Sequence, residues 1–218
     1  MKADFWHNRW ENQLTGFHLD EVNPHLKANW SLLKLEKNTR IFVPLCGKTL
    51  DLIWLAEQGF KVVGVELSAL AAEAFFTENN LAAQQSQVDG FTLWQSENIS
   101  IFCGDFFNLS NDILGKIDAV YDRASLIALP PVMRQDYAIK LMDLTQSASK
   151  LLITLEYDQS KMDGPPFSVS QSEVEALYSN GYEVKQQVAQ DVLDENERFR
   201  QKGLDFMNEC VYQLTPKK

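Results

Sequence analysis

One short turn combines residues that can hold a nucleotide-like ligand: Pro44-Leu45-Cys46-Gly47-Lys48, at the end of an apolar run that begins at Arg40. Dinucleotide sites use Gly-x-Gly-x-x-Gly, because the backbone must approach a pyrophosphate at a helix N-terminus. This turn has a single glycine. It is not a P-loop either, because Phe42 stands five residues before Gly47, where a P-loop has glycine. The turn therefore favours a ligand without a pyrophosphate.

Glu66 is a second residue that can bind such a ligand. It ends the apolar run Lys61–Glu66 and lies 19 residues after Gly47. In Rossmann-type sites, the acid that accepts ribose hydroxyls lies about 20 residues after the turn. From the spacing alone, a solvated glutamate before a helix capped by Ser68 is an equally good interpretation. Asp105, after a later strand, is a weaker candidate for contacting an adenine.

The elements around these residues alternate between strands and helices. Apolar runs predict strands at 40–45, 61–66, 99–102, 117–122 and 151–156, with helices at 50–56, 68–79 and 131–145 between them. This order predicts parallel strands with right-handed crossovers. A short strand at 91–93 and the strand at 99–102 flank residues 95–98, which predicts a hairpin-like excursion into the third parallel strand. A helix at 172–179 and two last strands at 183–188 and 210–214 complete the pattern. We expect an α/β fold: a Rossmann-like, seven-stranded, mostly parallel sheet with the last strand antiparallel and helices on both faces.

The N-terminal segment has a different pattern. Residues 4–35 carry apolar side chains at helical spacing and predict two helices joined around 16–24. Asp4 is a candidate cap for the first helix, and Asn23-Pro24 for the second. We expect a single domain over residues 1–218, with 1–38 as an N-terminal helical cover and 39–218 as the α/β core.

Composition narrows the possible partners. The formal net charge is −10, and no basic stripe of the kind that binds nucleic acid is visible. No apolar stretch is long enough to span a membrane, and no signal peptide is visible, so we expect neither a nucleic-acid nor a membrane partner. The three cysteines are far apart, which indicates free thiols and a cytoplasmic location. His7, His18 and His25 lack metal-site spacing, so no metal is expected, and a monomer is the default expectation.

The ordered motifs of this sequence resemble those of the thiopurine S-methyltransferase family, in its bacterial form, within the class I S-adenosylmethionine-dependent methyltransferases. The likeness runs from about Trp6 to Thr215. The motifs that carry it are Trp6…Trp10…Phe17-His18, Phe42-Val43-Pro44-Leu45-Cys46-Gly47-Lys48, Val62-Val63-Gly64-Val65-Glu66, Tyr121-Asp122-Arg123 and Gly164-Pro165-Pro166-Phe167. Tyr121 stands where relatives can have tryptophan.

The resemblance implies a cofactor, S-adenosylmethionine, and a small-molecule thiol acceptor. It assigns cofactor contacts to Trp10, Leu45, Glu66 and Arg123. It assigns acceptor contacts to Phe17 and Arg198, and a covering role to the Gly164–Phe167 loop. Each residue also has a plain structural interpretation. Trp10 can belong to the packed face of a helix and Leu45 to the core; Arg123 can pair with Asp122, and Arg198 can lie on a solvated face.

The resemblance further implies methyl transfer to the sulfur of thiopurines or similar aromatic thiols. No catalytic side chain is required for this reaction, because positioning the acceptor lowers the barrier. Arg123 is a candidate for orienting the acceptor. Two alternatives remain: a methyltransferase of the same fold acting on other thiols, halides or selenium and tellurium species, and a non-catalytic module that binds an adenosyl ligand.

Overall fold

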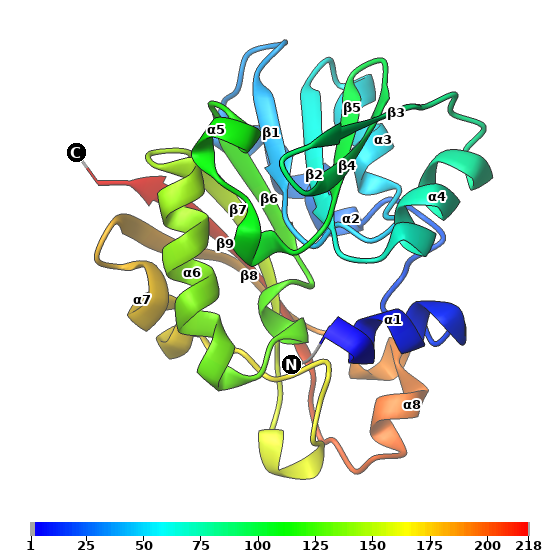
Figure 1. The fold of residues 1–218 in the computed structure, drawn as a ribbon. Coiled ribbons are helices and arrows are strands. Elements are labelled where there is room, and N and C mark those ends of the chain that lie inside the picture. The colour runs from blue at the N-terminus through cyan, green and yellow to red at the C-terminus, as the bar shows by residue number, and fades with distance from the viewer. Residues whose placement is uncertain (1–2, 218) are drawn as a thin grey trace.

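Within residues 3–217, which the computed structural model describes, the chain folds around one mixed β-sheet of nine strands (Figure 1). The strands are β1 (Arg40–Val43), β2 (Lys61–Glu66), β3 (Gln84–Val88), β4 (Phe91–Ser96), β5 (Ile99–Cys103), β6 (Ala119–Arg123), β7 (Ser149–Glu156), β8 (Tyr182–Asp191) and β9 (Asn208–Pro216). Their order across the sheet is β3-β4-β5-β2-β1-β6-β7-β9-β8.

The middle of the sheet is parallel. The strands β5, β2, β1, β6 and β7 pair with their neighbours in parallel register. They carry continuous apolar runs, since both faces of the sheet are covered. The predicted parallel α/β core is confirmed.

Helices cover both faces of this sheet (Figure 1). The α-helices are α1 (Ala3–Glu11), α2 (Pro24–Asn29), α3 (Asp51–Glu57), α4 (Ala69–Glu78), α5 (Asn111–Leu114), α6 (Pro131–Thr145), α7 (Gln171–Tyr178) and α8 (Glu197–Arg200). The short 3-10 turns are η1 (Trp30–Leu33), η2 (Phe106–Asn108), η3 (Leu126–Ala128), η4 (Gln159–Lys161) and η5 (Leu193–Glu195). One apolar cluster contains Tyr137 of α6 and Val174 of α7, and a second contains Leu52 of α3 and Phe75 of α4.

The prediction of seven strands was wrong, because the sheet has nine, with β3 and β4 at one edge. The predicted strand at 91–93 is part of β4, whereas β3 was not predicted. β3 pairs with β4, and β4 with β5, both antiparallel. β3 is polar and mostly exposed, so it lacks the apolar pattern that reveals a buried strand. The loop between β3 and β4 is Asp89-Gly90, with φ of 44° and 87°. Asp-Gly with both φ values positive is typical of a tight hairpin, so this dipeptide is the sequence signal that indicates β3.

The C-terminal strands match the prediction of an antiparallel last strand. β9 lies between β7 and β8 and runs antiparallel to both. The charged segment between β8 and β9 carries η5 and α8. It buries Leu193 and Phe199 in a third apolar cluster with Tyr157 and Met162.

The N-terminal segment forms the two predicted helices. Asn23 caps α2, since its side chain accepts hydrogen bonds from the backbone N–H groups of His25 and Leu26. Asp4 lies inside the first turn of α1 rather than at its cap, which corrects that detail. Helix α1 buries no residue fully and lies near α8, at one end of the sheet (Figure 1). Among the described residues, no helix is both long and apolar enough to cross a membrane.

Candidate functional site

The strand order of the sheet reverses at β1: β2 is added on one side of it and β6 on the other. In open α/β sheets, ligands bind at the carboxyl ends of the strands beside such a switch point. The backbone after β1 and β6 is unusual there. Leu45 and Ala124 have φ of 45° and 65°, although neither is glycine. Such conformations cost free energy and concentrate at functional sites, which points to these two turns.

A cleft opens at this point, with about 410 Å³ of empty space that includes open solvent. Its lining comes from the α1 region, from the turn after β1 and from the end of β6. The lining residues are Trp10, Phe17, His18, Val43, Leu45, Cys46, Gly47, Lys48, Thr49, Asp51, Tyr121, Arg123 and Ala124. The fold thus brings together four of the six predicted site residues: Trp10, Phe17, Leu45 and Arg123.

Trp10 lies directly on the turn after β1. A Cβ atom built on Gly47 would stand 3.2 Å from Cζ2 of Trp10, and Gly47 has a φ of +55°. Both the close approach and the backbone conformation favour glycine at this position. The Trp10 and Phe17 rings also pack edge to face, with centroids 5.5 Å apart. Trp10 of helix α1 and Phe17 of the α1–α2 connection therefore cover the cleft together.

Glu66 lies behind the cleft rather than in its lining. Its Oε2 accepts a hydrogen bond from the backbone N–H of Gly47 at 2.9 Å, and its Oε1 accepts one from that of Ser68 at 2.7 Å. Burial raises the pKa of Glu66, while these backbone hydrogen bonds act in the opposite direction. Each carboxylate oxygen has a second lone pair, so the group can still accept ligand hydroxyls.

Arg123, at the end of β6, joins the sheet to the α1–α2 connection. Its Nη1 donates a hydrogen bond to the carbonyl oxygen of Phe17 at 3.3 Å. The guanidinium therefore lies at the boundary between the turn after β6 and the aromatic cover.

A buried carboxylate, Asp51, fixes the other end of that connection. Its Oδ1 accepts from the backbone N–H of Asn23 at 2.8 Å, and its Oδ2 from the Tyr121 hydroxyl at 2.9 Å. Burial, followed by the Asp51 charge, raises the pKa of Tyr121. Asp51 and Tyr121 both line the cleft, yet residue spacing alone gave no indication of their pairing.

Arg198 lies outside the cleft lining. Its Nη2 donates to the carbonyl oxygen of Gly16 at 2.8 Å, and its guanidinium lies over the Phe199 ring. Asp105 is exposed, and its carboxylate accepts a hydrogen bond from the backbone N–H of Phe107. His18 and Lys48 line the cleft although no role was predicted for them. Their positions beside Phe17 and Gly47 in the quoted motifs were the available signal.

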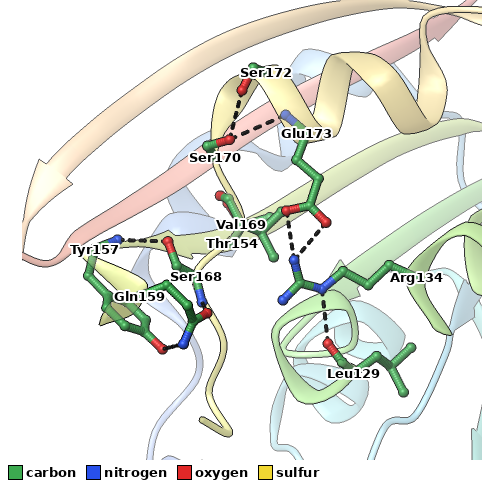
Figure 2. A network of polar contacts seen from close by, with 10 residues as sticks. All are labelled: Leu129, Arg134, Thr154, Tyr157, Gln159, Ser168, Val169, Ser170, Ser172 and Glu173. Atoms are coloured by element: carbon green, nitrogen blue, oxygen red, sulfur yellow. Dashed lines mark hydrogen bonds and ion pairs between the residues drawn. The ribbon is translucent and has the colours of Figure 1, made fainter. Parts of the chain in front are cut away.

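The Gly164–Phe167 loop, predicted as a cover, contributes no lining residue to this cleft. Figure 2 shows the contacts of Arg134 of α6 with Leu129 and with Glu173 of α7, next to this loop. Its Nε donates to the carbonyl oxygen of Leu129, and its Nη1 lies 2.6 and 2.7 Å from the two carboxylate oxygens of Glu173. Arg134 is buried, and its guanidinium lies 5.7 Å from the centroid of the Phe167 ring.

The other side of the loop is held by a second group of contacts (Figure 2). The backbone N–H of Tyr157 donates to the Ser168 hydroxyl, and the backbone N–H of Ser168 donates to Oε1 of Gln159. The Tyr157 hydroxyl donates to the carbonyl oxygen of Pro166 at 2.6 Å. The loop is thus held at its Pro166–Phe167 end and contributes no side chain to the lining of the cleft.

The donor set fits an adenosyl ligand that lacks phosphate. Glu66 offers carboxylate lone pairs beside the turn, and Trp10 and Leu45 offer apolar contacts. Nζ of Lys48, the lysine of the turn, is already held at 2.7 Å by both carboxylate oxygens of Glu78. Within residues 3–217, no group of three or more His, Cys, Asp or Glu side chains is placed to hold a metal ion.

Solved structures with this fold include S-adenosylmethionine-dependent methyltransferases. One is the 1,6-didemethyltoxoflavin-N1-methyltransferase of Burkholderia thailandensis with bound S-adenosylhomocysteine, at a TM-score of 0.64 and 14% identity over 99% of this chain and 87% of that one. Another, from Anabaena variabilis, has a TM-score of 0.61 and 15% identity over 99% of this chain and 94% of that one. At these identities the likeness defines the fold class.

The sequence relatives define the family within that class. The profile of the thiopurine S-methyltransferase (TPMT) family matches residues 1–217. The thiopurine S-methyltransferase of Nitrosospira multiformis is 46% identical over 215 residues, covering 98% of each chain. This chain belongs to the thiopurine S-methyltransferase family, which confirms the resemblance read from its motifs.

Proposed function

We propose that this chain transfers the methyl group of S-adenosylmethionine to the sulfur of thiopurines or of similar aromatic and heterocyclic thiols. The observation that supports this most directly is the cleft beside β1 and β6. It gathers Trp10, Phe17, Leu45 and Arg123 in a chain of this family. Apolar and aromatic walls together with the Arg123 guanidinium suit a flat, anionic acceptor.

The proposed roles on the cofactor side follow from these positions. Trp10 packs over the cofactor, and Leu45 contacts it from the turn after β1. Glu66 accepts the ribose hydroxyls with the lone pairs left by its two backbone partners. Arg123 lies between the cofactor and the acceptor.

The acceptor side is formed by the α1–α2 connection. Phe17 lines the acceptor pocket, and Arg198 reaches the same connection from α8 through the Gly16 carbonyl. When bound, S-adenosylmethionine supplies a sulfonium methyl group that is already activated for transfer. The chain therefore needs no nucleophile of its own; it places the acceptor sulfur in line, at about 3–3.5 Å. Arg123 cannot act as a base, but it stabilises the thiolate form of an acceptor and orients it.

We also propose that residues 1–218 act as one domain in the cytoplasm. Strand β9, near the end of the chain, lies inside the sheet between β7 and β8, which supports one folding unit. The three cysteines Cys46, Cys103 and Cys210 are unpaired, and free thiols suit a reducing compartment.

A labelled-methyl assay tests the proposed function. The purified protein is incubated with S-adenosylmethionine and, separately, 6-mercaptopurine, simple thiols, iodide and selenite. We expect the aromatic thiol to be the best acceptor. S-adenosylhomocysteine is expected to raise the melting temperature, whereas NAD is not. Binding of S-adenosylhomocysteine without methylation of any acceptor would establish a non-catalytic module instead.

A further inference from the structure

Most ionisable side chains in the cleft already have a partner. Lys48 is paired with Glu78, and Asp51 accepts hydrogen bonds from Asn23 and Tyr121. Each of these groups would have to break a contact before it could exchange a proton with a ligand.

The buried thiol and phenol of the cleft are also poor proton acceptors. Burial raises the pKa of Cys46 and that of Tyr121 well above their ordinary values, so both stay protonated at neutral pH. The Tyr121 hydroxyl is further committed as a donor to Asp51. Arg123 offers only N–H donors and no lone pair that could accept a proton.

His18 is the ionisable side chain of the cleft lining that can accept a proton without first breaking a hydrogen bond. Its side chain is only 16% exposed and lines the cleft next to Phe17. Within residues 3–217, neither nitrogen of its ring makes a hydrogen bond; the nearest carboxylate oxygen, Oδ1 of Asp20, is 3.9 Å from Nε2. A neutral imidazole has one nitrogen with a free lone pair, which can accept a proton from a ligand.

The groups around His18 favour that neutral form. Burial is the largest cause that lowers the pKa of His18, followed by the Lys48 ammonium, with Arg123 acting in the same direction. Asp20 and Glu78 act in the opposite direction. The net effect keeps the imidazole unprotonated near neutral pH, the state that a general base needs.

We propose that His18 is the general base that removes the proton from a neutral thiol acceptor in this cleft. This inference rests on the proposed function. The S–H bond of the acceptor breaks and its proton goes to the free ring nitrogen of His18, leaving the electron pair on sulfur. That pair forms the new S–CH₃ bond, and the electrons of the breaking methyl–sulfonium bond remain on the departing sulfur. His18 later returns the proton to water. Arg123 stabilises the thiolate, and His18 takes the proton.

Two thiols of nearly equal shape and different acidity test the assignment. At about pH 6, 4-nitrothiophenol is largely ionised, whereas most of the 4-methoxythiophenol keeps its proton. At this pH we expect His18→Gln to lower kcat/KM for 4-methoxythiophenol by about five- to tenfold, because only the minor thiolate fraction then reacts without a base. For 4-nitrothiophenol we expect a change below about threefold, because that acceptor needs no base. His7→Gln is the matched control: the same substitution on α1, at a residue outside the cleft lining, should leave both rates unchanged.

A second measurement does not depend on turnover. With S-adenosylhomocysteine bound, the absorbance of the 4-methoxythiophenol thiolate reports the ionisation of the bound thiol. We expect it to ionise at lower pH in the wild type than in His18→Gln and in His18→Asn. Equal losses with both thiols, or an unchanged ionisation, would overturn the role of His18. If the wild type binds S-adenosylhomocysteine but methylates neither thiol, the proposed function fails instead.

Discussion

Nη1 of Arg123 lies 3.3 Å from the carbonyl oxygen of Phe17, joining the end of β6 to a segment 106 residues earlier in the chain. Arg198 makes the corresponding contact with the neighbouring carbonyl, that of Gly16, at 2.8 Å. Two arginines from distant elements therefore hold adjacent peptide groups of the α1–α2 connection. The placement of Phe17, and of His18 after it, depends on both contacts.

Arg123→Ala removes the cation at the cleft as well as one of these contacts. We expect kcat to fall by about 10²–10³-fold, because a fixed positive group near a developing or bound thiolate is lost. Arg198→Ala serves as the comparison, since it removes contacts with the Gly16 carbonyl and the Phe199 ring, both outside the cleft lining; its effect on kcat should be smaller. Steady-state kinetics with 6-mercaptopurine measure both variants. Equal kcat values for Arg123→Ala and the wild type would remove Arg123 from the acceptor side.

Glu66→Gln keeps the shape of the side chain and removes its charge. The amide also brings its own N–H groups toward the N–H of Gly47 or Ser68, where only an acceptor fits. We expect the Kd for S-adenosylhomocysteine to rise at least about tenfold, since a hydrogen bond to a charged group contributes about 1.5–3 kcal/mol. Calorimetry measures the affinity, with Glu73→Gln on the exposed side of α4 as the control. Unchanged affinity in Glu66→Gln would exclude the ribose role.

The parallel core could be predicted because strands buried on both faces leave continuous apolar runs in the sequence. Gly47 and Glu66 could be placed because the chain order fixes which strand ends meet. β3 could not be found by hydrophobic pattern, since an exposed edge strand buries no face; only Asp89-Gly90 marked its turn.

Site residues could be predicted from the sequence only where a recognisable motif stands at the end of a predicted strand. Leu45 and Arg123 follow β1 and β6 directly, so the fold brings them together. Residues 12–23 have no period that predicts their path, and their contacts with Arg123 and Arg198 come from residues 106 and 182 positions later in the chain. The role of His18 depends on that path, which explains why its position in the cleft could not be derived from spacing.

Arg134 and Glu173 form an ion pair that connects α6 to α7 beneath the Gly164–Phe167 loop. Because Arg134 is buried, removing one partner leaves an uncompensated charge in the interior. We expect Glu173→Leu to lower the free energy of unfolding by about 3–5 kcal/mol. Arg134→Met combined with Glu173→Leu should recover much of that loss, because no buried charge remains. Urea denaturation of the two single variants and the double variant measures the coupling. Additive losses would show that the pair is not coupled.

Lys150 makes stability depend on pH at alkaline values. Burial lowers the pKa of Lys150 from 10.5 to about 7, so between these values the unfolded chain binds a proton that the folded chain does not. The free energy of unfolding is therefore expected to rise from about pH 7 to about pH 10. Burial raises the pKa of Asp122 from 3.8 to about 6, so the free energy of unfolding falls as the pH rises through this range. This effect lies below the pH range in which Lys150 acts.

Lys150→Met removes the titrating group while keeping a long apolar side chain. We expect the rise between about pH 7 and pH 10 to disappear in this variant. Urea denaturation at several pH values measures it in both proteins. The same slope in Lys150→Met and the wild type would assign the effect to another group.

Helix α1 is expected to become ordered when the cofactor binds. It buries no residue fully; Trp10 lies on Gly47, and the helix also packs against α4. A helix without a fully buried residue opens at little cost in free energy. A ligand beneath Trp10 would add a further contact to these. Hydrogen exchange of residues 3–11 should therefore slow when S-adenosylhomocysteine is added, while exchange in β1 and β2 stays the same.

In Trp10→Ala the slowing should be lost, because the cover then has no aromatic contact with the ligand. If S-adenosylhomocysteine does not change the exchange of α1 in the wild type, the helix is already ordered without ligand, and ligands reach the cleft by another path.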